Sequence, residues 1–170
     1  MYKYTVCLIM KENQLLLLNR KKKPAMGMWH GVGGKIEENE TPVEGVLRET
    51  FEETGIRLKD VSYAGNAVLN SKDGSEGMYI FVAHLPDDVH VQTPLNTDEG
   101  ILDWRTTDWI LDKDNMGVIG NLKSYLPSIL KAEYGLEHTF IYDAHTILDY
   151  TTSKIMKNEI STRYKKSLLV

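Results

Sequence analysis

The chain has 170 residues, 42% of them hydrophobic and 26% charged, and carries a formal net charge of −4. These values are typical of one globular domain with a proper core, and they exclude the strong positive field of a duplex-binding protein. The single cysteine, Cys7, excludes an internal disulfide and a thiolate zinc cage and indicates a reducing, cytoplasmic setting.

The N-terminal segment predicts a β-hairpin. Its apolar runs, YTVCLIM at 4–10 and QLLLLN at 14–19, are separated by the turn-forming KEN. Both runs are too short to span a bilayer, charges interrupt them, and no signal peptide is visible. We therefore expect a cytoplasmic protein with no membrane partner.

Residues 20–34 predict a long surface loop. The loop carries four successive basic residues, Arg20 to Lys23, followed by Pro24 and a series of glycines. Such a basic run is typical either of a solvated loop or of a contact with phosphate, and the sequence leaves both interpretations open.

Residues 42–54 predict a helix with well-defined ends. Thr41 is the expected N-cap, and Pro42 takes the first helical position. Glu44 completes a capping box with Thr41, and Gly55 is the expected stop.

This helix places three glutamates on one narrow arc. At about 100° per residue, Glu52 and Glu53 fall roughly 60° and 40° to either side of Glu49, and we expect all three to face outward. The like-charge pair Glu49 and Glu53 costs only roughly 0.2–0.5 kcal/mol, which a solvated face tolerates. Clustered carboxylates behind a glycine-rich loop also suit Mg²⁺, and we favour a metal site. The stripe expected to face the core consists of Val43, Val46, Leu47, Thr50 and Phe51.

The rest of the chain predicts strands and one further helix. Apolar residues recur at helical spacing over 121–135, where Pro127 predicts a kink or a boundary. Strands are expected at 61–70 and 77–85, a strand followed by a turn at 101–111, and a hairpin at 138–151.

No repeat, low-complexity tract or linker divides the chain. We predict one α/β (α+β) domain over 1–152, followed by a tail, 153–170, that is either a docked helix or a loose end. The basic residues of the tail have few aromatics among them, so no nucleic-acid polymer is expected as a partner. The sequence leaves open whether the protein is a monomer or a homodimer.

Residues 34–56 resemble the Nudix box, G-x5-E-x7-R-E-U-x-E-E-x-G-U, in which U is a bulky apolar residue. One position departs, because Thr50 stands at the first U, and its hydroxyl needs a partner such as a backbone carbonyl one turn back. The matching positions are Gly34, Glu40, Arg48, Glu49, Glu52, Glu53, Gly55 and Ile56.

The resemblance implies the Nudix fold, a mixed sheet between helices, and hydrolysis of a nucleoside diphosphate linked to another group. It implies Mg²⁺ as the cofactor, with Mn²⁺ as the alternative. Glu52 and Glu53 resemble metal ligands, and Glu49 resembles either a ligand or the base that activates water. The backbone carbonyl of Gly33 resembles a further ligand, and Arg48 resembles the residue that orients the glutamates.

A late acidic residue often completes the metal site in this family. The segment NTDEGILDW offers Glu99 as the candidate and Asp98 as the runner-up.

Two further segments, MWHGVGGKIEENET at 28–41 and HTILDYT at 145–151, resemble the MutT-homologue branch of oxidised-purine nucleoside triphosphatases, the 8-oxo-dGTPases. This similarity implies a nucleoside triphosphate substrate, cleaved to pyrophosphate and a nucleoside monophosphate. The chain departs from that branch at His30, where an asparagine is common, and in DKDNMGVIGNL, which lacks the adjacent aspartates that read the purine edge.

Two alternative functions remain in view. One is a Nudix hydrolase of ADP-ribose or of a dinucleotide polyphosphate, although the lack of a proline between Ile56 and Pro86 counts against ADP-ribose. The other is a Nudix-fold sensor that binds nucleotide without hydrolysing it, which the complete set of box glutamates disfavours.

The remaining candidate residues would contact substrate. Arg20 and Lys35 flank the glutamates and are candidate phosphate contacts. Trp29 is consistent with stacking on a base or with packing. His30 stands at a position that contacts substrate in the MutT-homologue branch. Asn115 or Asn121 offers an amide for a purine edge.

Overall fold

A computed structural model describes residues 2–156 of the protein, and its elements are as follows. The helices are α1 (Pro42–Thr54), α2 (Thr107–Leu111) and α3 (Gly120–Leu130). The strands are β1 (Tyr4–Lys11), β2 (Gln14–Arg20), β3 (Trp29–His30), β4 (Ser62–Ser71), β5 (Gly74–His84), β6 (Leu95–Asn96), β7 (Gly100–Thr106), β8 (Leu136–Asp143) and β9 (Thr146–Lys154).

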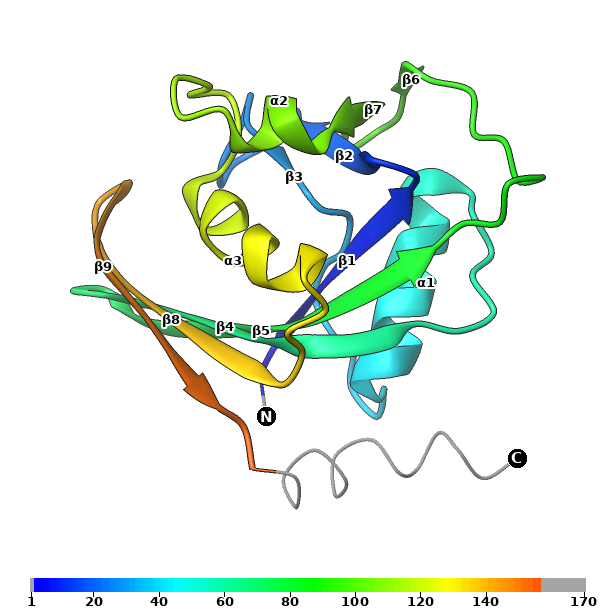
Figure 1. Ribbon diagram of the computed structural model, residues 1–170. Helices are drawn as coiled ribbons and strands as arrows, with labels where there is room; N and C mark the ends of the chain where they lie inside the picture. Colours follow the sequence, from blue (N-terminus) through cyan, green and yellow to red (C-terminus); the bar gives the residue numbers. More distant parts are fainter. Residues whose placement is uncertain (1, 157–170) are drawn as a thin grey trace.

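All strands belong to one mixed sheet that lies between helices. The strand order is β6-β7-β2-β1-β5-β4-β8-β9, and β3 pairs with β2 off this path. Helix α1 packs on one face, and α2 and α3 pack on the other (Figure 1). The predicted fold, a mixed sheet between helices, is confirmed.

The central strands separate two hydrophobic cores because alternate side chains of a strand face opposite sides. On β1, Cys7 and Ile9 face α1 and pack with its Val46. Leu8 and Met10 face the other side, where the core includes Leu122 of α3. Burial on both faces explains why β1 and β2 appear in the sequence as continuous apolar runs.

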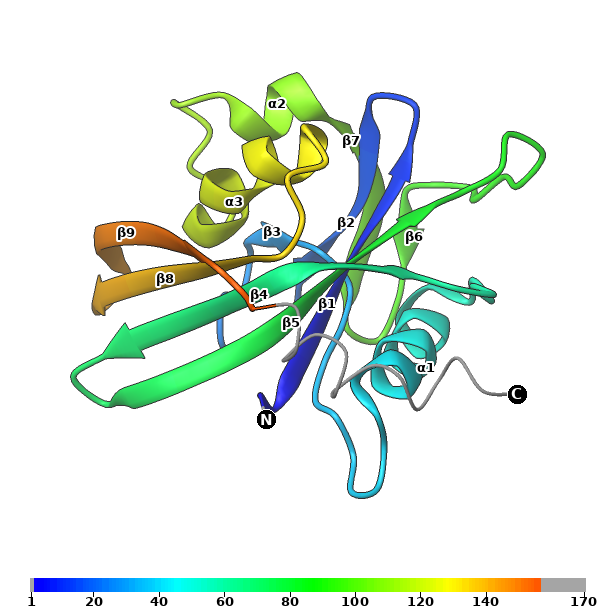
Figure 2. The same cartoon turned by 60° about the horizontal axis from the view of Figure 1, so that its bottom comes forward.

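Figure 2 shows the long β4–β5 hairpin with β8 and β9 beside it, and β8 pairs with β4 in parallel. Strand β9 ends at Lys154, and most of the tail expected at 153–170 lies outside the described residues. Over residues 2–156, no helix is both long and apolar enough to cross a membrane.

The short elements β3, β6 and α2 were not predicted, because each is too short to show a period in the sequence. Pro127 lies inside α3 and marks no boundary. Packing of Leu126 and Ile129 on the core holds the turn around the proline, so tertiary contacts override the local preference.

Candidate active site

Helix α1 begins and ends where the sequence predicts. The Thr41 hydroxyl accepts a hydrogen bond from the Glu44 backbone N–H at 3.2 Å, and the Glu44 carboxylate accepts one from the Thr41 N–H at 2.7 Å. At the other end Gly55 adopts a left-handed conformation, with φ of 73°, and donates its N–H to the Phe51 carbonyl. These caps fix the register of the helix and therefore the side on which each glutamate lies.

Arg48 links the glutamates of this helix to one another. Its guanidinium makes a two-pronged ion pair with Glu40, through Nε at 2.8 Å and Nη2 at 3.0 Å. Its Nη1 donates to Glu49 and to Glu52, at 3.0 Å each, and Nη2 also donates to the Lys35 carbonyl. Glu40 belongs to the box pattern but was not expected in the site, and the structure shows that it anchors Arg48.

Glu53 is buried, with 8% of its surface exposed, so the expectation that all three glutamates face outward is wrong for this residue. The loop that precedes α1 covers it, and the Gly33 N–H donates to Glu53 Oε2 at 2.8 Å. The loop lies close because Gly33 has a φ of 143° and a Cβ there would fall 2.3 Å from the Thr5 carbonyl. Burial raises the pKa of Glu53 to about 7, and the charge of Glu49 adds to the shift.

Glu49 lies beside the same loop. Burial raises its pKa, while the hydrogen bond from Arg48 opposes the shift. A Cβ on Gly34 would fall 2.5 Å from the Glu49 carboxylate, so only glycine leaves room for that carboxylate here. In contrast, the hydrogen bond from Arg48 holds the pKa of Glu40 below its usual value.

Two features of α1 differ from the expected apolar stripe. Phe51 is 38% exposed and lies under the Arg57 guanidinium, 3.9 Å from the ring centre. Thr50 is buried next to Cys7. Among residues 2–156 its hydroxyl has no hydrogen-bond partner of good geometry, so the expected bond to a carbonyl one turn back is not formed. It is Thr54 whose hydroxyl bonds one turn back, to the Thr50 carbonyl.

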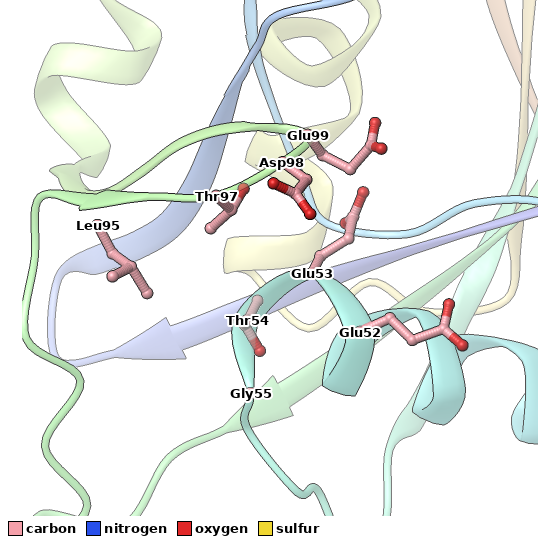
Figure 3. A pocket seen from close by; sticks show the side chains of 8 residues that line it. All are labelled: Glu52, Glu53, Thr54, Gly55, Leu95, Thr97, Asp98 and Glu99. Atoms are coloured by element: carbon pink, nitrogen blue, oxygen red, sulfur yellow. The ribbon is translucent and has the colours of Figure 1, made fainter.

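A hollow lies between the C-terminal part of α1 and the turn at 97–99 (Figure 3). In Figure 3, Glu53 reaches from the helix toward the turn that carries Asp98 and Glu99, whereas Glu52 points along the helix away from it. Both side chains line the hollow, and the charge of Glu99 contributes to the raised pKa of Glu53. The structure thus brings both predicted late acids to the predicted glutamates.

Basic residues balance part of this negative charge. Lys22 pairs with Glu99 at 2.8 Å and holds the pKa of that carboxyl below its usual value. Arg20 also acts on Glu99 and on Glu53, in each case favouring the charged carboxylate. The basic run therefore lies at the edge of the hollow, and the Lys22 contact had no signal in the sequence beyond that run.

The residues fit a hard divalent cation. Carboxylates and the carbonyl of Gly33 supply only oxygen donors, which Mg²⁺ and Mn²⁺ prefer. Burial raises the pKa of both Glu49 and Glu53, and a cation beside them would offset this by favouring the charged carboxylates. In the described part of the chain, no three acidic, histidine or cysteine side chains form a ready-made cage.

Two of the candidate substrate contacts lie on the other side of the sheet. Trp29 packs edge-to-face on Trp109, and the Arg105 guanidinium lies 4.5 Å from the Trp29 ring centre. The Asn115 amide is engaged by its own loop, donating to the Trp109 carbonyl and accepting from the Gly117 N–H. Trp29 thus contributes to packing on this side of the sheet, and the Asn115 amide to the structure of its own loop.

Asn121 is buried and His30 is half-buried. Asn121 lies at the start of α3, 4% exposed, and its carbonyl oxygen accepts the Leu122 N–H. His30 is paired in register with Leu18, so it faces the α1 side rather than the α3 side. Its Nδ1 contacts the Gly31 carbonyl, and its buried Nε2 has no hydrogen-bond partner in the described part of the chain. Burial lowers the pKa of His30 to about 4.

Comparison with known proteins gives consistent matches. A model of the NUDIX domain matches residues 1–123. The oxidized purine nucleoside triphosphate hydrolase of Mus musculus is 29% identical over 154 residues, which cover 89% of this chain and 94% of that protein. The uncharacterized Nudix hydrolase YvcI of Bacillus subtilis is 31% identical over 143 residues, which cover 81% of this chain and 85% of that protein. A crystal structure of a MutT protein from Bacillus halodurans superposes with a TM-score of 0.74 at 26% identity and covers 90% of this chain and 98% of that one.

Proposed function

The chain belongs to the Nudix hydrolase family, and on this basis we propose that it is a nucleoside triphosphate pyrophosphohydrolase that uses a divalent cation, Mg²⁺ or Mn²⁺. We propose oxidised purine nucleoside triphosphates as substrates, with pyrophosphate and a nucleoside monophosphate as products. One observation carries the proposal of a cation site: a buried glutamate with a pKa near 7, Glu53, faces a second carboxylate, Glu99, across a hollow. The name of the mouse relative supports the class of substrate.

Glu53, Glu99 and the Gly33 carbonyl would hold the cation. Glu52 would join them once its exposed side chain turns away from Arg48 and toward the hollow. A cation bound there supplies positive charge opposite the phosphates and lowers the pKa of water. Glu53 gains most from this role, since burial without a counter-charge disfavours its ionised form.

Glu49 is the residue that we assign to proton uptake from the attacking water. A glutamate that binds a cation loses its affinity for protons, which leaves Glu49 rather than Glu53 as the base. Its pKa is already raised by burial, toward the value that suits a base near neutral pH. Arg48 donates to Glu49 and is itself anchored by Glu40, so the carboxylate is held in one orientation.

Arg20 and Lys35 are the proposed phosphate contacts. Arg20 acts electrostatically on Glu53 and Glu99, and the Lys35 carbonyl is bonded to Arg48 beside the glutamates. For the base we propose Asn121 rather than Asn115, since the Asn115 amide is already bonded at both ends. The Asn121 carbonyl oxygen accepts the Leu122 N–H, and within residues 2–156 its amide nitrogen donates no hydrogen bond.

The test of this function is a panel of normal and oxidised purine nucleoside triphosphates, with ADP-ribose included, assayed in Mg²⁺. Pyrophosphate and orthophosphate release are measured separately, and we expect pyrophosphate alone and faster turnover of the oxidised purines. Equal rates on the four ordinary triphosphates, without a gain on oxidised ones, would remove the proposed substrate class.

A pair of variants tests the assigned roles. We expect Glu53→Gln to lose both cation binding and nearly all turnover with the fold intact. Glu49→Gln should keep cation binding but lose about 10²–10⁴-fold in rate, the usual contribution of a positioned base. Calorimetry with Mn²⁺ measures cation binding by each variant and so distinguishes the two roles. Wild-type activity in Glu53→Gln would overturn the metal-site assignment.

A further inference from the structure

Two neighbouring lysines hold the turn at 97–99 in different ways. The Lys21 backbone N–H donates to the Glu99 carbonyl at 2.9 Å, and the Lys21 ammonium donates to the Thr97 carbonyl at 2.5 Å. The Lys22 ammonium instead binds the Glu99 carboxylate, at 2.8 Å from Oε1. Lys21 therefore binds the main chain of the turn, whereas Lys22 binds the side chain of Glu99.

These contacts have opposite consequences for a cation that binds Glu99. The bonds of Lys21 go to main-chain carbonyls and remain in place when the carboxylate is ligated. The Lys22 bond uses a carboxylate oxygen that the cation needs, and an ammonium close to a divalent ion is repelled. The Lys22 side chain is 61% exposed and the Glu99 side chain 39%, so the pair is a weak one that a cation can displace.

We propose that Lys22 is a positioning residue that acts as a placeholder counter-ion for Glu99 and leaves when the cation binds. Lys21 has the opposite role, because its bonds to main-chain carbonyls hold the turn in the position in which a cation can bind. The inference rests on the proposed function, since it takes Glu99 as a cation ligand. The inference predicts that removing the charge of Lys22 raises cation affinity, whereas removing the charge of the adjacent Lys21 lowers it.

The third lysine of the run supplies a matched control. The Lys23 side chain makes neither a hydrogen bond nor an ion pair within residues 2–156, so Lys23→Gln reports only the long-range effect of removing one positive charge. Mn²⁺ binding to Lys21→Gln, Lys22→Gln and Lys23→Gln is measured by calorimetry without nucleotide. Relative to Lys23→Gln, we expect Lys22→Gln to bind about two- to fivefold tighter, the range for an exposed ion pair. Lys21→Gln should bind about twofold weaker or worse.

Coupling to Glu99 separates this role from a general effect on the loop. In a Glu99→Gln background, we expect Lys22→Gln to change Mn²⁺ affinity no more than Lys23→Gln does, and Lys22→Arg should bind like the wild type. Equal affinities for Lys22→Gln and Lys23→Gln, or weaker binding by Lys22→Gln, overturn the inference while the proposed function stands. A wild-type chain that takes up no Mn²⁺ overturns both.

Discussion

At Glu53, the burial that favours cation binding lowers the stability of the fold. The carboxylate lies under the Gly33 loop with 8% of its surface exposed, and its pKa rises from an ordinary 4.5 to about 7. Without a cation, the folded chain therefore binds this proton more tightly than the unfolded chain does. A residue selected for folding alone would be apolar here.

This shift predicts a pH dependence of stability. The contribution of the Glu53 proton is fully present below about pH 4.5 and is lost as the pH rises through about 7. In a chelator, we expect the free energy of unfolding to fall by about 2–3 kcal/mol from this group between about pH 5 and pH 8. Urea denaturation across this range, for wild type and Glu53→Gln, measures it. Parallel pH profiles for the two proteins would show that Glu53 carries no such proton.

Gly34 gives a second prediction at the scale of one residue. The three atoms nearest to a Cβ at this position all belong to the Glu49 carboxyl group, the first at 2.5 Å, and that side chain can move. We expect Gly34→Ala to displace the Glu49 carboxylate and lower kcat by about tenfold to a hundredfold, because small misplacements of a reacting group are costly. The unfolding free energy should stay within about 0.5 kcal/mol. In a Glu49→Ala background, Gly34→Ala should cause no further loss of kcat. A further loss would show that Gly34→Ala acts on a group other than Glu49.

At the scale of elements, α1 is the one on which the site depends most. Its capping box consists of reciprocal bonds between Thr41 and Glu44, both visible in the sequence. We expect Thr41→Ala to lower the unfolding free energy by about 1 kcal/mol, since one N-terminal N–H loses its acceptor. Thr41→Ser keeps the hydroxyl and should restore most of the loss. Chemical denaturation measures both, and equal stabilities for alanine and serine would mean that the cap contributes nothing.

Local signals predicted the elements that local chemistry determines. The ends of α1 follow from Thr41, Pro42 and Gly55, and the first hairpin follows from two apolar runs around a turn. The burial of Glu53 and the exposure of Phe51 were not predictable in this way. Both depend on which loop covers the helix, and a helical wheel contains no such information.

At the scale of the molecule, the site joins segments that are distant in the sequence. Strands β2 and β7 pair so that Arg20 lies opposite Gly100, which brings the basic run at 20–23 next to the turn at 97–99. The sequence suggested Arg20 and Glu99 separately, but their proximity comes from a non-local strand pairing. The same sheet separates the glutamates from Trp29, which faces the core under α3.

Because the proposed cation would bind the folded chain and neutralise charge that the basic residues leave unbalanced, the whole fold should respond to metal. A ligand that binds only the folded state at about 100 times its Kd adds about 2.7 kcal/mol. For a chain of this length that corresponds to a Tm increase of roughly 5–11 °C. We expect this increase with Mn²⁺ at about pH 8, and a smaller one at about pH 5.5, where a proton competes for Glu53.

Variants locate the effect in the proposed site. Glu53→Gln should lose most of the Mn²⁺-induced increase in Tm, because it removes the carboxylate that gains most from the cation. Glu133→Gln, an exposed glutamate just after α3, should keep all of it and serves as the control for the loss of one negative charge. Thermal melts of the three proteins, with a chelator and with Mn²⁺, measure this increase in Tm. If Glu53→Gln and wild type gain the same number of degrees, the cation binds the folded chain without this carboxylate, and the site lies elsewhere.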